Sequence, residues 1–123
     1  MTDSPAETVS ANLAAALAGE ADLRRELTAI AESTALVPDD EHDAEGSTIG
    51  YERARVATLL AGTERRIAEL VIAAERVRAG TYRSCEGCGN DIGDERLEAL
   101  PATRLCALCA NRESGRGRGS RAG

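Results

Sequence analysis

The four cysteines of this chain all lie between residues 84 and 109, in the segment SCEGCGNDIGDERLEALPATRLCALC. Two residues separate the members of each pair, Cys85 with Cys88 and Cys106 with Cys109, and seventeen residues separate the pairs. A two-residue gap lets both sulfurs of a pair face one tetrahedral metal, and this combination of short and long gaps is typical of zinc sites with two such turns. The sequence therefore predicts one bound Zn²⁺ with Cys85, Cys88, Cys106 and Cys109 as its ligands.

A centre with four sulfur ligands has no open position for water, so we expect the zinc to be structural and not catalytic. Gly89 follows the second cysteine and permits the tight turn of such a site. Arg83, Arg96 and Arg104 are candidates to moderate the net charge of four thiolates around Zn²⁺. The single histidine, His42, is far from the cysteines in the sequence and is not expected to be a ligand.

Two other roles for the cysteines remain open at this stage. A disulfide framework requires an oxidising compartment, and the chain shows no export signal or long apolar run at its start, so we expect a cytoplasmic protein without membrane contact. A thiol redox response is compatible with zinc, because CxxC pairs can oxidise when the metal is lost.

Two apolar stripes with the spacing of a coiled coil precede the cysteines. The first stripe contains Val9, Leu13, Ala16, Leu23, Leu27, Ile30 and Val37, with Glu20 and Thr34 interrupting it. The second contains Ile49, Val56, Leu60, Ile67, Leu70, Ala74 and Val77, with Arg53 and Thr63 interrupting it. Aligned about Asp43, the two stripes match almost position for position, so the sequence predicts a long antiparallel two-helix coiled-coil hairpin over residues 1–80.

Local signals place the ends of this hairpin. Ser4, Pro5 and Glu7 form a helix-starting pattern, and Gly80 is a candidate helix end. Pro38, five acidic residues and two glycines make the segment VPDDEHDAEGSTIG a turn, with an acidic tip at about residues 38–48.

The remaining chain is expected to form a zinc module at 81–112 with a short C-terminal helix, followed by a disordered basic tail at 113–123. The fold class is therefore mainly α: the hairpin plus a small four-cysteine zinc module.

Composition excludes several classes of function. A formal net charge of −6 argues against broad binding to nucleic-acid phosphates, and the absence of Phe and Trp argues against a large core. No nucleophile with a neighbouring base and no open metal site is evident, so we do not expect an enzyme. The alternatives that remain are a regulatory interaction protein and a zinc-stabilised DNA-binding or protein–protein adaptor with thiol redox sensitivity.

The segment GTYRSCEGCGNDIGDERLEALPATRLCALCA, preceded by a hairpin with an acidic turn, resembles the DksA/TraR family of bacterial transcription regulators. The resemblance implies a monomeric factor that binds RNA polymerase without sequence-specific DNA contact. Such a factor inserts its coiled-coil tip through the secondary channel to modulate initiation, often together with the alarmone ppGpp. Asp39, Asp40, Asp43 and Glu45 are the candidate residues of the tip that acts on the polymerase.

The chain departs from the family pattern at two places. Counted back from Cys85, the two aspartates and the alanine of the family's tip motif fall on His42, Glu45 and Ser47, whereas Asp40 and Asp43 keep the same spacing two residues earlier. The basic positions associated with ppGpp fall on Glu69, Leu100 and Ala110. The sequence therefore predicts an acidic tip of altered geometry and a protein that acts without ppGpp at the shared site.

Overall fold

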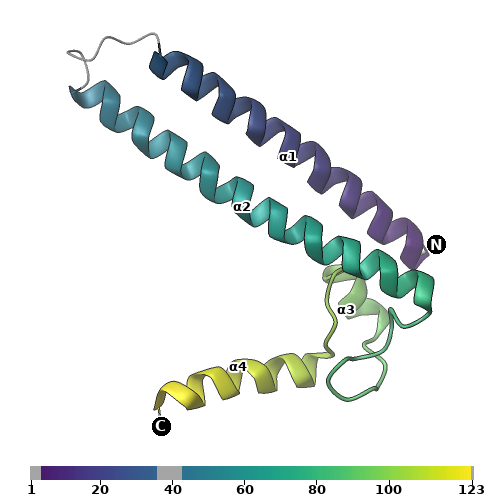
Figure 1. The fold of residues 1–123 in the computed structure, drawn as a ribbon. Coiled ribbons are helices and arrows are strands. Elements are labelled where there is room, and N and C mark those ends of the chain that lie inside the picture. Colours follow the sequence, from purple (N-terminus) through teal and green to yellow (C-terminus); the bar gives the residue numbers. More distant parts are fainter. Residues whose placement is uncertain (1–3, 36–42, 123) are drawn as a thin grey trace. The chain divides into compact units, whose positions relative to one another are not determined.

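The structure, a computed structural model, describes the backbone of residues 4–35 and 43–122 and the side chains of 4–35 and 48–115. Its helices are α1 (Pro5–Ala35), α2 (Asp43–Ala79), α3 (Asp94–Ala99) and α4 (Ala107–Ala122) (Figure 1). Between these bounds the described chain contains no strand, only an isolated antiparallel bridge between Ser84 and Asp91. The expected mainly helical class, with a hairpin of two long helices and a small cysteine module, is confirmed.

The chain divides into two compact units. One consists of Ala14–Ala68, and the other combines Met1–Leu13 with Glu69–Gly123. The first turns of α1 and the last turns of α2 therefore belong with the cysteine module.

Within the unit Ala14–Ala68, α1 and α2 run antiparallel and bury the apolar positions that the sequence marks (Figure 1). Val56 is fully buried and Leu60 is 9% exposed. Leu23, Leu27, Ile30 and Ile67 are half-buried. The stripe is therefore the contact surface of the two helices, as the coiled-coil spacing predicts.

Polar contacts between the helices support the predicted register. Nη2 of Arg53 lies 3.4 Å from Oγ1 of Thr34, so two of the residues that interrupt the stripes meet each other. Arg24 pairs with Glu64 at 2.8 Å across the same interface. These pairs are exposed and contribute little stability each, but they are consistent with only one alignment of the helices.

The second unit has its own core, which joins the helices to the cysteine module. Its buried members are Val9, Ala73, Tyr82, Cys85, Ile92, Leu97 and Cys109. Tyr82 is 5% exposed, and its hydroxyl donates a hydrogen bond of 2.7 Å to the carbonyl of Pro101. Two cysteines are thus part of the packed interior of this unit.

Both ends of the long helices that reach this unit are capped as the sequence predicts. At the start of α1 the Ser4 hydroxyl accepts a hydrogen bond from the Glu7 N–H, and the Glu7 carboxylate accepts one from the Ser4 N–H. At the end of α2 Gly80 has φ +79°, the Thr81 N–H bonds the Arg76 carbonyl, and the Gly80 N–H bonds the Val77 carbonyl. This pair of bonds is a Schellman motif, which turns the chain from α2 into the cysteine module.

Two predicted boundaries differ from the structure. The sequence predicts a turn through residue 48, but α2 already begins at Asp43. Acidic residues in the first turn of a helix are stabilised by the positive end of the helix dipole. The low helix propensity of the single residue Gly46 is not sufficient to end the helix. The sequence also predicts a disordered tail at 113–123, whereas α4 extends to Ala122. The tail contains no proline, and its glycines lower helix propensity without removing a backbone donor.

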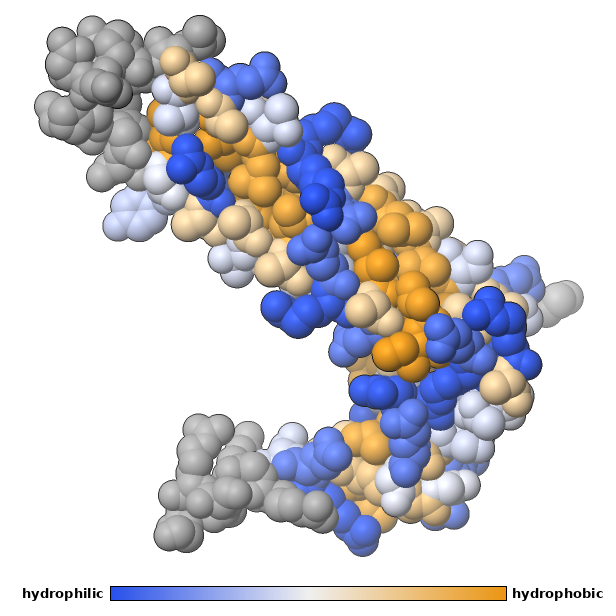
Figure 2. All heavy atoms as spheres, in the orientation of Figure 1, coloured by the Kyte–Doolittle hydropathy of each residue, from blue (hydrophilic) through white to orange (hydrophobic). Residues whose placement is uncertain are grey.

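Charged side chains cover much of the visible surface of the helices and leave apolar surface between them (Figure 2). In the part of the chain whose side chains are described, the large apolar residues on the surface include Leu17, Leu59, Val71 and Ile72. None of the described helices combines the length and the apolar character that spanning a bilayer requires.

Candidate metal centre

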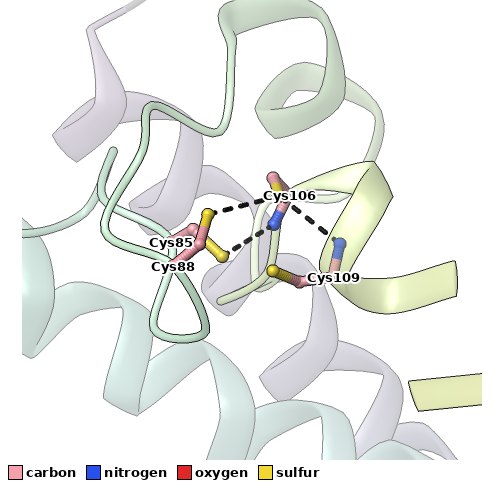
Figure 3. Close-up of side chains that lie close together, drawn as sticks. All are labelled: Cys85, Cys88, Cys106 and Cys109. Atoms are coloured by element: carbon pink, nitrogen blue, oxygen red, sulfur yellow. Dashed lines mark hydrogen bonds between the residues drawn. The ribbon is translucent and has the colours of Figure 1, made fainter. Parts of the chain in front are cut away.

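The first pair of cysteines lies on a tight turn that follows α2. The Gly89 N–H donates to the Cys85 carbonyl and the Cys85 N–H donates to the Asn90 carbonyl, both at 2.8 Å. Gly89 has φ +79°, a conformation that residues with a Cβ rarely adopt. These bonds fold residues 85–90 so that Cys85 and Cys88 lie on the same side of the turn (Figure 3).

The second pair lies where α4 begins. The Ala110 N–H donates to the Cys106 carbonyl at 2.9 Å, which is the first helical bond of this segment. The Cys109 N–H approaches Sγ of Cys106 at 3.5 Å. One helical turn therefore brings Cys106 and Cys109 together.

Hydrogen bonds also connect the two pairs to each other. The Glu86 N–H donates to the Arg104 carbonyl at 2.8 Å, and the Cys106 N–H donates to Sγ of Cys85 at 3.3 Å (Figure 3). A third donor, the Gly87 N–H, reaches Sγ of Cys85 at 3.3 Å. Backbone donors that point at a sulfur are suited to a thiolate.

The geometry of the four sulfurs fits one tetrahedral ion. All four Sγ atoms lie within 4.8 Å of one another, and those of Cys88 and Cys106 are 3.9 Å apart. A tetrahedron with Zn–S bonds of about 2.3 Å has edges of about 3.8 Å, so this separation is close to what zinc requires. All four cysteines are free thiols, which does not support a disulfide framework. Cys85 and Cys109 are buried, whereas Cys88 is exposed.

The thiols of Cys85 and Cys109 differ in acidity. The hydrogen bond from the Cys106 N–H lowers the pKa of Cys85 to about 6, with further donors from the adjacent turn acting in the same direction. The pKa of Cys109 is raised to about 12, because its thiol is hydrogen-bonded to the neighbouring cysteine sulfurs and is desolvated. In the metal-free protein, Cys85 therefore ionises well before Cys109.

Gly87 is a residue of this centre that the spacing argument misses. A Cβ at this position would lie 2.9 Å from Sγ and 3.2 Å from Cβ of Cys109. A residue between two cysteines is otherwise free to vary in a CxxC pattern, so no local signal distinguishes it. The requirement arises only because the second pair packs against the first turn.

The three arginines expected near the centre have different positions. Arg83 pairs with Asp94, and with Asp91 at 3.5 Å. Arg104 lies 3.7 Å from Glu86. Arg96 contacts the backbone that leads into the second pair, since its Nε donates to the Leu105 carbonyl at 2.9 Å.

The sequence does not single out a fourth arginine, Arg76, as a neighbour of the cysteines. Its side chain is only 9% exposed and lies beside the first turn. Its Nη2 donates to the carbonyls of Thr81 and Ser84. The available signal is its spacing, because Arg76 follows buried Ala73 by three residues and so lies on the buried face of α2.

The predicted tip residues are not brought into this centre by any described contact. Asp39 and Asp40 lie outside the described residues, as does His42. Asp43 and Glu45 belong to the first turns of α2, where the backbone is described and the side chains are not. Their role remains a prediction.

Comparison with known proteins agrees with this geometry. Residues 80–115 match the family described as the prokaryotic dksA/traR C4-type zinc finger. An uncharacterized protein of Aquifex aeolicus (strain VF5) is 50% identical over 50 residues, which cover 38% of this chain and 34% of that protein. The match thus spans about a third of the length of this relative.

The fold has a counterpart among solved structures. The structure of transcription factor DksA2 from Pseudomonas aeruginosa matches with a TM-score of 0.64 and 21% identity, and the match covers 91% of this chain and 87% of that chain. At this identity the likeness concerns the fold, whereas the cysteine module is matched by its own sequence. Residues 80–115 therefore carry a zinc finger of the prokaryotic dksA/traR C4 type, and the fold of the chain is similar to that of DksA2.

Proposed function

We propose that this protein is a transcription regulator that binds RNA polymerase directly, as a monomer, and that its cysteine module is a structural zinc site. The observation that carries the proposal is a C4 module of the DksA/TraR type joined to a two-helix hairpin whose fold resembles transcription factor DksA2. The polymerase is a protein partner, which suits a chain with a net charge of −6 better than free nucleic acid does.

The zinc site consists, in this proposal, of Cys85, Cys88, Cys106 and Cys109 around one ion. Four thiolates complete the tetrahedral coordination that zinc prefers and leave no position for a substrate or an activated water. When bound, the ion supplies structural stabilisation and no reaction chemistry. The protein is accordingly a regulator and not an enzyme.

The acidic tip at residues 38–48 is the part proposed to act on the polymerase, by insertion through the secondary channel. Its carboxylates, those of Asp39, Asp40, Asp43 and Glu45, could contact catalytic Mg²⁺, its ligands or basic loops, because hard cations prefer oxygen ligands. Support comes from the match of the cysteine module to the dksA/traR zinc-finger family, from the likeness of the fold to DksA2, and from the concentration of acidic residues in this segment.

Regulation by this protein is proposed to be independent of ppGpp at the shared site. The three positions that correspond to the basic residues of the family are Glu69, Leu100 and Ala110. A carboxylate repels a pyrophosphate and the two aliphatic side chains offer no donor, whereas phosphate binding normally needs Arg or Lys.

The ion pairs of the cysteine module favour this function over a DNA-binding zinc finger. Arg83 pairs with two aspartates and Arg104 with Glu86, so these cations face carboxylates of the module itself. Base or phosphate recognition needs cationic side chains that are available to the nucleic acid. Sequence-specific DNA contact is therefore not part of the proposal.

Transcription in vitro with the host polymerase tests the proposal. The double variant Asp40→Asn, Asp43→Asn should keep polymerase binding close to wild type and lose the effect on initiation. The matched control Glu32→Gln, Glu75→Gln removes the same amount of charge from exposed positions on α1 and α2, and should keep both properties. Loss of binding in the Asp40/Asp43 variant would contradict an acting tip and indicate an anchor. Absence of wild-type binding to polymerase would overturn the proposed function.

Calorimetric titration of ppGpp tests the independence from this alarmone. The affinity of ppGpp for the polymerase should be the same with and without the protein. A gain that depends on the protein and disappears when Glu69 or Leu100 is substituted would contradict the proposal.

A further inference from the structure

Arg76 and Arg96 occupy equivalent positions relative to the two cysteine pairs, although they come from different helices. Arg76, near the end of α2, donates from Nη2 to the carbonyl of Ser84, the residue directly before Cys85. Arg96, in α3, donates from Nε to the carbonyl of Leu105, the residue directly before Cys106, at 2.9 Å. Each arginine thus holds the peptide group that leads into the first cysteine of a pair.

The peptide groups held in this way are part of the hydrogen bonding of the centre. The peptide between Leu105 and Cys106 accepts from Arg96 through its carbonyl and donates through its N–H to Sγ of Cys85 at 3.3 Å. A donor to the carbonyl polarises the peptide and strengthens the bond that its N–H makes on the other side. Arg96 therefore acts on a predicted zinc ligand through one intervening peptide.

Arg76 acts on the first turn in the same manner. The peptide between Ser84 and Cys85 accepts from Arg76 and donates through its N–H to the Asn90 carbonyl at 2.8 Å, which closes the turn carrying Cys85 and Cys88. A second bond of 2.8 Å from Arg76 to the Thr81 carbonyl fixes the connection from α2 into this turn. The planar guanidinium suits two carbonyls at once, which a lysine ammonium cannot match in fixed geometry.

The burial of Arg76 adds an electrostatic argument. Its exposed fraction is 9%, and within the described residues its Nη1 has no hydrogen-bond partner. Among the residues whose side chains are described, the carboxylate paired with it is that of Glu86, which is 3.9 Å from Nε and is shared with Arg104. A buried cation with so little compensation is favoured by a nearby anionic centre, and four thiolates with Zn²⁺ carry a net charge of −2.

We propose that Arg76 and Arg96 are positioning residues of the metal centre, which set the orientation of the two ligand-bearing turns and thereby the zinc affinity. This inference rests on the zinc site of the proposed function and is independent of the action on polymerase. Outer contacts that orient the ligands of a metal commonly change its affinity about 10- to 100-fold when they are removed.

The experiment measures zinc affinity by competition with a chelator for the wild type, Arg96→Met and Arg76→Met. Both variants should bind zinc about 10- to 100-fold more weakly than the wild type. Arg104→Met is the matched control, because the Arg104 side chain pairs with Glu86 and holds neither of these two carbonyls. Its zinc affinity should remain within about threefold of the wild type.

Two further measurements separate positioning from general stability. The Co²⁺-loaded variants should show an altered ligand-field spectrum, because the sulfurs are no longer held in the same tetrahedron. The melting temperature should fall more for the zinc-loaded than for the metal-free protein. Arg96→Lys keeps a donor and the charge, so it should recover part of the affinity that Arg96→Met loses, even if Arg76→Met does not fold.

Three outcomes have distinct meanings. Zinc affinities of Arg96→Met and Arg76→Met equal to that of the control would overturn the inference. Equal destabilisation of the zinc-loaded and metal-free forms would also overturn it and indicate a purely structural role. A wild-type protein that binds no zinc would instead overturn the metal site of the proposed function, and this failure is visible before any variant is compared.

Discussion

Replacing Gly87 by alanine places a methyl group against a sulfur of the metal centre. The added carbon would lie 2.9 Å from Sγ of Cys109, 3.2 Å from its Cβ and 3.4 Å from Cδ2 of Leu105. Since non-bonded carbon contacts are favourable at about 3.5 Å or more, the sulfur must move by roughly 0.6 Å. Zinc sites tolerate deviations of only about 0.2 Å in their ligand distances, so this movement is incompatible with an undisturbed centre.

The cost of this clash should appear mainly in the metal-bound state. Without metal the Cys109 thiol can rotate away from the methyl group, whereas zinc holds it in place. Overpacking by one methyl group typically costs about 1 to 3 kcal/mol. Assigned to the bound state alone, this range corresponds to zinc binding that is about 5- to 150-fold weaker. The entropy that alanine removes from the unfolded chain affects both states equally and does not change the ratio.

Competition with a chromophoric chelator measures the effect of Gly87→Ala directly. The control is Gly115→Ala on α4, which makes the same chemical change where a Cβ has no neighbour within 4 Å. Its zinc affinity should equal that of the wild type. If Gly87→Ala binds zinc within about twofold of the wild type, the first turn does not pack closely against Cys109.

Three further predictions concern the cores and the pH dependence. Leu70→Ala removes a fully buried side chain and should lower the free energy of unfolding, measured by urea denaturation, by about 2 to 5 kcal/mol. The Leu59 side chain is 47% exposed, so Leu59→Ala should lower it far less. Equal losses in the two variants would contradict the burial of Leu70. Tyr82→Phe removes the hydrogen bond to the Pro101 carbonyl and should lower the free energy of unfolding by about 0.5 to 1.5 kcal/mol. An unchanged melting temperature would contradict this prediction. Zinc affinity should fall as the pH is lowered, by about tenfold per pH unit for each thiol proton that the metal must displace. Cys109 carries such a proton throughout the neutral range, because its pKa is raised to about 12. Chelator competition at about pH 6 and about pH 8 checks the sign, and an affinity independent of pH would contradict it.

Signals between near neighbours in the sequence predicted a large part of the structure. The pattern of Ser4 and Glu7 gives the start of α1, and Gly80 gives the end of α2 with its positive φ. These features could be predicted because a cap depends on residues within one turn of each other. Even the pairing of Arg53 with Thr34 follows from the two stripes, since antiparallel helices of matched spacing meet in one register.

The positions of the helix ends beside the acidic segment and in the tail were not predicted as well. Acidic and glycine-rich composition suggested a turn through residue 48 and a disordered tail, but α2 begins at Asp43 and α4 reaches Ala122. Helix propensities differ by only about 1 kcal/mol per residue among these residue types, so composition sets a preference and not a boundary.

Ligand spacing and apolar periodicity are properties of the chain alone, so a cluster of four cysteines and a hairpin of two helices could both be predicted from the sequence. The residues that hold that centre in shape could be identified only from the folded chain. Gly87 is constrained by Cys109, and Arg76 holds the carbonyl before Cys85. The physical reason is that packing and hydrogen bonding act over distances of a few ångströms in space, and the folded chain alone brings these separate segments within that range.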